Sequence, residues 1–362
     1  MTNERPERVT AALAERELDL LLVSHLVNVR WLTGFTGSSG TAVIGVGGDR
    51  VTRRFLTDFR YLSQSEEQLD GSWQREIVQD LLESAVGGLP TDGAVRLGFD
   101  DDHMSVKQHA KLQRLAPGNV ELVAAGGLIE DLRMVKDAAE IARIRAAALL
   151  ADAALEAVLG RGLAGRTEQE VAFDLETEMR RMGAEGPSFP SIVASGAHGA
   201  LPHAVPRDVE IPDGVLVTID WGAQLDGYAS DCTRTYATGQ ISDGDRDIYE
   251  LVQRAQAAAL AAVRPGPTGK EVDAVAREII DGAGHAEHFG HGLGHGVGME
   301  VHEGPRLSRL GDVVLAAGHI VTVEPGVYVP GDAGVRIEDL VAVTEDGHDV
   351  LSTLSKELTI VH

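Results

Sequence analysis

The sequence contains a single cysteine, Cys232, among its 362 residues, and this excludes a disulfide bond within the chain. It also lacks any run of about 20 apolar residues, the length needed to cross a bilayer, so we expect no membrane-spanning helix. The first ten residues, MTNERPERVT, are charged and contain no apolar stretch of the kind found in secretory signals. Together these absences predict a protein of the reducing cytoplasm.

Basic residues are scarce relative to acidic ones. The chain has 32 Lys and Arg against 56 Asp and Glu, which gives a formal net charge of −24 at pH 7. A charge of this sign repels nucleic acids and anionic membranes, so we expect neither as a partner. The charge does not identify a substrate.

The length of the chain and its hydrophobic content of 43% leave room for two domains with sizeable cores. We place the boundary after the small-residue segment 124–127, which gives an amino-terminal domain of residues 1–127 and a second domain of residues 128–362. Alternating strands and helices in the first domain predict an α/β layer. The expected strands are 18–23, 41–46 and 51–57, and the expected helices are 5–17 and 58–68.

The second domain is expected to be α+β, with helices interspersed among antiparallel hairpins. Two of its helices begin with a capping residue that is followed three positions later by Glu, the arrangement of a capping box. Asp137 and Glu140 start the first of these, and Thr167 and Glu170 start the second. Two further helices are expected over residues 242–263 and 268–282.

Five potential metal ligands lie in the second half of the chain, each in a short strand-like or turn-rich motif. They are Asp220 in VTIDWG, Asp231 in YASDCTRT, His295 in HGLGHGVG, Glu324 in VTVEPGVY and Glu338 in GVRIEDL. Four carboxylates balance the charge of two divalent ions, and oxygen ligands with one imidazole favour Mn²⁺, Co²⁺, Fe²⁺ or Zn²⁺ over Ca²⁺. Two such ions roughly 3.5–4 Å apart generate a nucleophile from water and polarise the carbonyl that it attacks. The motifs therefore indicate a hydrolase.

Two hairpins are expected to bring the four acids together. In the first, Asp220 and Asp231 lie on strands 215–221 and 228–236, joined by a turn at 222–227. The second hairpin repeats the plan with Glu324 and Glu338, on strands 320–329 and 335–344 around a turn at 330–334. Arg or backbone donors can also satisfy a buried acid. However, acids are depleted in strand interiors and costly to bury unpaired, so four on two similar hairpins favour a metal site.

In this order and spacing, the motifs resemble those of the prolidase and aminopeptidase P metallopeptidases, which share the "pita-bread" fold with creatinase and methionine aminopeptidase. The resemblance in the second half is carried by FPSIVASGAH, LPHA, TIDWGA, GYASDCTRT, FGHGLGHGVGMEVHE, TVEPGVYVP and GVRIEDL. In the first half it is carried by VRWLTGFTGSSG and FLTDFRYL. It implies a creatinase-like α/β amino-terminal domain, an α+β pita-bread catalytic domain and a homodimer. Creatinase itself lacks the metal ligands, whereas all five positions are kept here.

The resemblance assigns each ligand to an ion. It implies that Asp220 binds one metal only and that Asp231 and Glu338 bridge both. His295 and Glu324 complete the second ion, and Glu324 also handles the proton of the bridging water.

Five further residues match active-site positions of the family that are not ligands. His302 is expected to hydrogen-bond the scissile carbonyl or its oxyanion, while His203 and His291 are expected to contact the substrate on its leaving side. Tyr328 and Arg336 match residues that brace the bridging carboxylates and the substrate.

The implied reaction is cleavage of the Xaa-Pro bond in small peptides with proline in second position. Two divalent ions, Mn²⁺ or else Co²⁺ or Zn²⁺, are the expected cofactors. We favour an Xaa-Pro aminopeptidase that accepts longer peptides, with an Xaa-Pro dipeptidase as the alternative. Arg306 bears on this choice, because it matches an arginine that some prolidases use to bind the dipeptide carboxylate, but it could equally be an exposed loop residue. Phosphotriester hydrolysis is a further hypothesis, and a non-catalytic partner-binding role is disfavoured because all five ligand positions are kept.

Overall fold

The computed structural model describes residues 4–47 and 50–361, so residues 1–3 of the charged start lie outside it. The chain divides into two compact units, Met1–Arg133 and Met134–His362. This division falls after most of helix α6 (Leu128–Met134), whereas the sequence placed it before that helix. Most of α6 goes with the first unit because Leu128 and Ile129 are buried and Arg133 Nη1 donates to Asn28 Oδ1 at 2.7 Å. Within the described ranges, no helix has both the length and the apolar character that crossing a membrane requires.

The first unit is an α/β layer built on a six-stranded sheet of order β4-β3-β2-β1-β5-β6. β1 lies inside the sheet and is buried along its whole length, as expected of a strand covered on both faces. The strands are β1 (Leu20–Val23), β2 (Gly40–Gly47), β3 (Arg50–Thr57), β4 (Gln74–Ile77), β5 (Val95–Phe99) and β6 (Val120–Ala124). The helices are α1 (Arg5–Glu15), α2 (Leu26–Thr33), α3 (Leu62–Gln68), α4 (Leu81–Gly87) and α5 (Val106–Leu115).

Two predicted helices of this unit differ from the observed ones. α1 ends at Glu15 rather than continuing to residue 17, because Glu17 adopts a positive φ of 55° that no α-helix contains. The predicted helix 58–68 consists of a 3₁₀ turn, Phe59–Tyr61, followed by α3. The side chain of Asp58 accepts from the backbone N–H of Arg60 and caps that turn.

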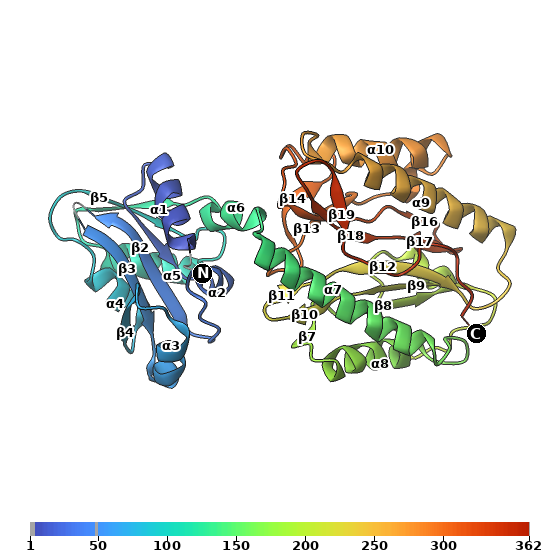
Figure 1. The fold of residues 1–362 in the computed structure, drawn as a ribbon, viewed down its shortest axis with the longest axis horizontal. Helices are drawn as coiled ribbons and strands as arrows, with labels where there is room; N and C mark the ends of the chain where they lie inside the picture. Colours follow the sequence, from blue (N-terminus) through green and yellow to red (C-terminus); the bar gives the residue numbers. More distant parts are fainter. Residues whose placement is uncertain (1–3, 48–49, 362) are drawn as a thin grey trace. The chain divides into compact units, whose positions relative to one another are not determined.

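The second unit places two pairs of helices on opposite sides of its strands (Figure 1). α7 (Ala138–Leu159) and α8 (Glu168–Arg181) form one pair, and α9 (Asp243–Ala262) and α10 (Gly269–Gly282) form the other. The predicted capping boxes at Asp137 and Thr167 are both present. Each pair contributes to a different hydrophobic core, so the two halves repeat one plan.

Small sheets complete the α+β architecture of this unit. β12-β9-β8 and β11-β10-β7 belong to the half that carries α7 and α8, while β14-β13-β15-β18-β19 and the pair β16-β17 belong to the half with α9 and α10. The bounds in the first half are β7 (Gly186–Pro187), β8 (Ile192–Ser195), β9 (Leu216–Trp221), β10 (Ala223–Leu225), β11 (Tyr228–Ala229) and β12 (Cys232–Ala237). In the second half they are β13 (Gly294–Gly296), β14 (Glu303–Leu307), β15 (Ile320–Val323), β16 (Gly326–Tyr328), β17 (Gly334–Arg336), β18 (Asp339–Val343) and β19 (His348–Val350).

Three of the four predicted arms, 228–236, 320–329 and 335–344, are interrupted and form two short strands each. The predicted arm 215–221 is continuous as β9, and a further short strand, β10, follows it. The first turn is tighter than predicted and is centred on Asp226 and Gly227, whose φ values are 48° and 78°. Asp231 lies immediately before β12, Glu324 between β15 and β16, and Glu338 between β17 and β18. Three of the four acids therefore lie where a ladder breaks, and only Asp220 lies inside a strand.

Candidate metal centre

Three acids from both hairpins converge on one point. Asp220, Asp231 and Glu338 each offer an oxygen that lies within 4.8 Å of the oxygens of the other two. Asp220 in β9 is paired across the ladder with Thr233 in β12, which places it beside Asp231 at the start of that strand. The backbone N–H of Glu338 donates to Thr233 O at 3.0 Å and ties the second hairpin to the first.

His295 and Glu324 complete the cluster. His295 Nε2 is 3.3 Å from Glu324 Oε1 and 3.5 Å from Asp231 Oδ2. The other ring nitrogen, Nδ1, is 3.1 Å from Gly296 O, so it donates to that carbonyl and leaves the Nε2 lone pair directed at the acids when the ring is neutral. All five predicted ligands thus face one another.

The cluster is poorly neutralised by the protein itself. Burial raises the pKa of Asp231 well above its ordinary value, and the charges of Glu338 and Asp220 raise it further. Burial likewise raises the pKa of Glu338, with added repulsion from Glu324 and Asp220. Burial would raise the pKa of Glu324 too, but a hydrogen bond from the protonated His295 ring and the charges of His295, His291 and Arg336 together outweigh burial and bring that pKa to about 2.

Two buried oxygens of the cluster, Asp220 Oδ1 and Glu338 Oε1, have no hydrogen-bond partner among the described residues. A buried carboxylate oxygen without a donor is costly, whereas a divalent cation would satisfy it. The donor set of four carboxylates and one imidazole nitrogen therefore fits a pair of such ions.

A chain of hydrogen bonds from Arg336 through Tyr328 to His291 supports the cluster. Arg336 Nη2 donates to Asp220 Oδ2 at 2.7 Å, and Nη1 donates to the Tyr328 hydroxyl at 2.8 Å. The Tyr328 hydroxyl is 2.9 Å from His291 Nε2, while His291 Nδ1 is 2.7 Å from Gly292 O. Because Nδ1 must donate to that carbonyl, Nε2 of a neutral His291 accepts the Tyr328 proton. Burial lowers the pKa of His291, which favours this neutral form.

The remaining predicted histidines border the cluster. The ring centroids of His302 and His295 are 4.4 Å apart, and burial together with the charge of His295 lowers the pKa of His302. His203 is exposed on the turn that follows residues 196–200, and its charge contributes to the lowered pKa values of both His291 and His302. The structure thus gathers all three histidines around the five predicted ligands.

Arg306 lies on β14 rather than in a loop, and its side chain is exposed. β14 pairs with β13, the strand that carries His295. The arginine therefore extends into solvent from the strand next to the metal cluster.

Two threonines that the sequence did not single out orient the predicted ligands. Thr233 Oγ1 donates to Glu338 Oε2 at 2.8 Å, and Thr322 Oγ1 donates to Glu324 Oε1 at 2.9 Å. Their positions could have been found, because Thr233 follows Asp231 by two residues and Thr322 precedes Glu324 by two. Alternate residues of an extended chain point to the same face.

Glu168, at the start of α8, is a further residue that sequence reasoning missed. It is fully buried and accepts from Ser195 N at 2.9 Å, from His198 Nδ1 at 2.9 Å and from Arg207 N, Nε and Nη2, each at 3.0 Å. These contacts tie down the segment 195–207, which carries His203. Burial raises the pKa of Glu168, but the hydrogen bonds from Arg207 and Ser195 outweigh it and lower the pKa to about 2.

Glu168 should make stability depend on pH in a defined window. The pKa of Glu168 falls from 4.5 to about 2 on folding. Its contribution to the free energy of unfolding is therefore complete above pH 4.5 and is lost as the pH falls from 4.5 toward 2. Glu168→Gln should lower the free energy of unfolding at pH 7 by about 2 kcal/mol, with the gap from wild type closing as the pH falls below 4.5. Urea titrations at pH 3.5, 5 and 7 measure this. The exposed Glu156→Gln is the control, and a gap that stays constant with pH would contradict the assignment.

Comparison with known proteins identifies the families that the two units resemble. The model of metallopeptidase family M24 matches residues 142–345, and that of the creatinase/prolidase N-terminal domain matches residues 5–135. The Xaa-Pro dipeptidase of Pyrococcus furiosus is 37% identical over 98% of this chain and 99% of its own length. The structure of an Xaa-Pro dipeptidase from Bacillus anthracis is 38% identical, with a TM-score of 0.92 and 99% of each chain covered. That of an X-Pro aminopeptidase from Thermotoga maritima is 34% identical, with a TM-score of 0.88 over 98% of this chain and 99% of the other.

Proposed function

The chain belongs to metallopeptidase family M24, and we propose that it is an Xaa-Pro dipeptidase with two divalent ions, Mn²⁺ foremost. The observation that carries the proposal is the cluster of Asp220, Asp231 and Glu338, which His295 and Glu324 adjoin and which contains buried carboxylate oxygens without a hydrogen-bond partner among the described residues. Full-length similarity to the dipeptidases of P. furiosus and B. anthracis supports the dipeptide substrate. These relatives favour the dipeptidase over the aminopeptidase that the sequence analysis preferred.

Divalent ions at such a centre supply a nucleophile from water at neutral pH and polarise the attacked carbonyl. We assign the proton of the attacking water to the carboxylate of Glu324, which His295 and Thr322 hold in place. We assign to His302, whose ring lies beside that of His295, the hydrogen bond to the substrate carbonyl oxygen as charge develops there. The carboxylates, Asp220 among them, provide the counter-charge for the free α-amine of the dipeptide.

His291 acts through Tyr328 in this proposal. Both of its ring nitrogens are engaged by the protein, one with Gly292 O and one with the Tyr328 hydroxyl. His291 therefore holds the Tyr328 hydroxyl, which Arg336 also contacts. In this proposal the exposed His203, and not His291, contacts the proline side of the substrate.

Arg306 is proposed to select dipeptides by pairing with their terminal carboxylate. Such a charge-assisted pair contributes about 1.5–3 kcal/mol, so Ala-Pro should be cleaved roughly 10–100-fold better than Ala-Pro-Ala, and Arg306→Ala should erase the difference. The measurement is kcat/KM for both peptides in wild type and variant, and the control is Arg309→Ala, an exposed arginine on the same segment. A wild type that cleaves both peptides equally well, with no effect of Arg306→Ala, would favour the second candidate.

That second candidate is an Xaa-Pro aminopeptidase. It is favoured by the similarity to the T. maritima aminopeptidase, whose coverage and TM-score are close to those of the dipeptidase structure from B. anthracis. In that case Ala-Pro-Ala is a good substrate and the exposed Arg306 has no carboxylate to bind.

A further inference from the structure

The backbone of the predicted ligand Glu338 is held from outside its own sheet. It lies at the interruption between β17 and β18, where the ladder that fixes neighbouring residues is absent. Its N–H donates to Thr233 O, and its carbonyl accepts from the guanidinium of Arg234 through Nη1. Among the described residues, the donor to its carboxylate is Thr233 Oγ1, and the other carboxylate oxygen has none. The direction of this side chain therefore depends strongly on how its backbone is held.

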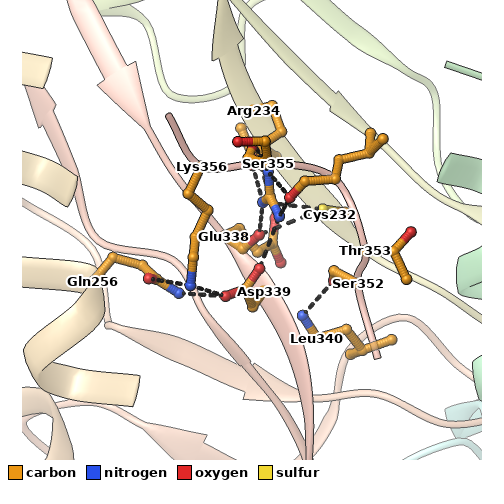
Figure 2. Close-up of polar contacts among 12 residues, drawn as sticks. Cys232, Arg234, Gln256, Glu338, Asp339, Leu340, Ser352, Thr353, Ser355 and Lys356 are labelled. Atoms are coloured by element: carbon orange, nitrogen blue, oxygen red, sulfur yellow. Dashed lines mark hydrogen bonds and ion pairs between the residues drawn. The ribbon is translucent and has the colours of Figure 1, made fainter. Parts of the chain in front are cut away.

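Arg234 lies behind the metal cluster, on the same strand as Thr233 and pointing to the opposite face of β12. Its side chain is 1% exposed, and Nη1 also donates to Thr233 O at 2.9 Å. One nitrogen thus joins the carbonyls of Thr233 and Glu338, one on each hairpin. The other guanidinium nitrogens reach Leu354 O at 2.7 Å and Ser355 O at 3.1 Å, so the same group also holds the carboxyl-terminal segment (Figure 2).

The charge of Arg234 is balanced by Asp339, the residue after Glu338. Asp339 Oδ1 accepts from Arg234 Nη2 at 2.8 Å, and Oδ2 accepts from Gln256 Nε2 at 2.9 Å and from Lys356 Nζ. Figure 2 shows Lys356 and Arg234 approaching Asp339 from different sides. The Lys356 backbone is fixed in turn, because its carbonyl accepts from Gln253 Nε2 at 2.8 Å.

We propose that Arg234, held by Asp339 and by the carbonyls of Leu354 and Ser355, is a positioning residue that sets the metal affinity of the centre through the backbone of Glu338. This inference rests on the proposed function. Arg234 touches neither metal nor substrate, and acts by fixing the distance between the two hairpins that supply Asp231 and Glu338. Residues that orient a ligand in this way typically change metal affinity about 10–100-fold when they are replaced.

The test is Arg234→Lys, which keeps the positive charge but loses the fork that joins the two carbonyls. Mn²⁺ is titrated calorimetrically into chelator-treated wild type and variant, at a temperature where circular dichroism shows both to be folded. The variant should bind Mn²⁺ about 10–100-fold more weakly, with kcat on Ala-Pro recovering as Mn²⁺ is raised to saturation. Unchanged Mn²⁺ affinity together with a lower melting temperature would overturn the proposal, because a purely structural residue gives that result.

Two further variants keep the test decisive. Arg54→Lys alters another buried arginine, one that pairs with Glu76 in the first unit, and should lower stability without changing Mn²⁺ affinity. Lys356→Met removes only the contact between Lys356 and Asp339, so this variant replaces Arg234→Lys in the test if Arg234→Lys does not fold. Lys356→Met should bind Mn²⁺ more weakly than the wild type. An affinity equal to that of the wild type would count against the proposal. A wild type that binds no Mn²⁺ and leaves Ala-Pro intact would refute the proposed function instead.

Discussion

Replacing Asp231 with Asn should abolish metal binding and lower kcat/KM on Ala-Pro by at least about 10³-fold, because stabilisation by the metal ions is worth several kcal/mol. Asp231 is 3.5 Å from His295 and shares the centre with Asp220 and Glu338, so the amide removes an anionic ligand without changing the shape of the side chain. Chelator treatment of the wild type should have the same effect and should be reversed by Mn²⁺. Metal content by atomic emission and kinetics on Ala-Pro measure both results.

The same substitution should stabilise the metal-free protein. Burial and the charges of Glu338 and Asp220 raise the pKa of Asp231, which means that its ionised form is disfavoured in the folded state. An amide carries no such charge. Metal-free Asp231→Asn should therefore melt at a higher temperature than metal-free wild type, whereas added Mn²⁺ should raise the melting temperature of the wild type alone.

The control for both effects is Asp349→Asn. Asp349 is about half exposed and pairs with Arg145 at the surface, so it should leave metal content, activity and melting temperature close to those of the wild type. Full metal occupancy in Asp231→Asn would contradict the role of Asp231 as a ligand. A metal-free variant no more stable than the metal-free wild type would show that the carboxylates do not repel one another.

The parts that could be predicted from the sequence are those that local patterns determine. The helices starting at Asp137 and Thr167 were located because capping boxes act within four residues. The five predicted ligands could be singled out because each acid lies in a short strand-like or turn-rich motif and the histidine lies in a glycine-rich one. The two-domain plan with an α/β layer and an α+β unit followed from the alternation of short periodic segments.

The breaks in the strands could not be predicted, since they come from contacts between distant segments. A Cβ atom at Gly222 would lie 1.9 Å from Ser230 O, so the two arms of the first hairpin approach each other too closely there for any side chain. The partners of two buried charges could not be predicted either. Glu168 forms an ion pair with Arg207, and Arg234 forms one with Asp339, which is 105 residues away in the sequence. Arg306 was difficult for another reason. The sequence left open whether it lies in an exposed loop, and only the pairing of residues 303–307 with β13 shows that it lies in a strand.

Arg336→Met should lower the free energy of unfolding of the metal-free protein by about 3–5 kcal/mol, the cost of removing one partner of a buried ion pair. Arg336 is 4% exposed and donates to Asp220 Oδ2, to the Tyr328 hydroxyl at 2.8 Å and to Thr233 Oγ1 at 3.0 Å. Its loss leaves Asp220 unneutralised. Urea denaturation of chelator-treated protein measures the change. The surface variant Arg145→Met is the control, with an expected loss of about 0–1 kcal/mol.

Mn²⁺ should reduce the difference in free energy of unfolding between Arg336→Met and the wild type, because the metal ions and Arg336 neutralise the same carboxylates. Asp220 has one oxygen on Arg336 and one that is buried without a donor among the described residues, so an ion at the second oxygen offsets part of the charge that the missing guanidinium leaves behind. By linkage, saturating Mn²⁺ must then stabilise Arg336→Met more than it stabilises the wild type. Equal stabilisation of the two proteins would mean that Arg336 and the metals act on separate charges. The variant should still be slow on Ala-Pro with Mn²⁺ bound, because Tyr328 has lost the donor that fixes its hydroxyl against His291.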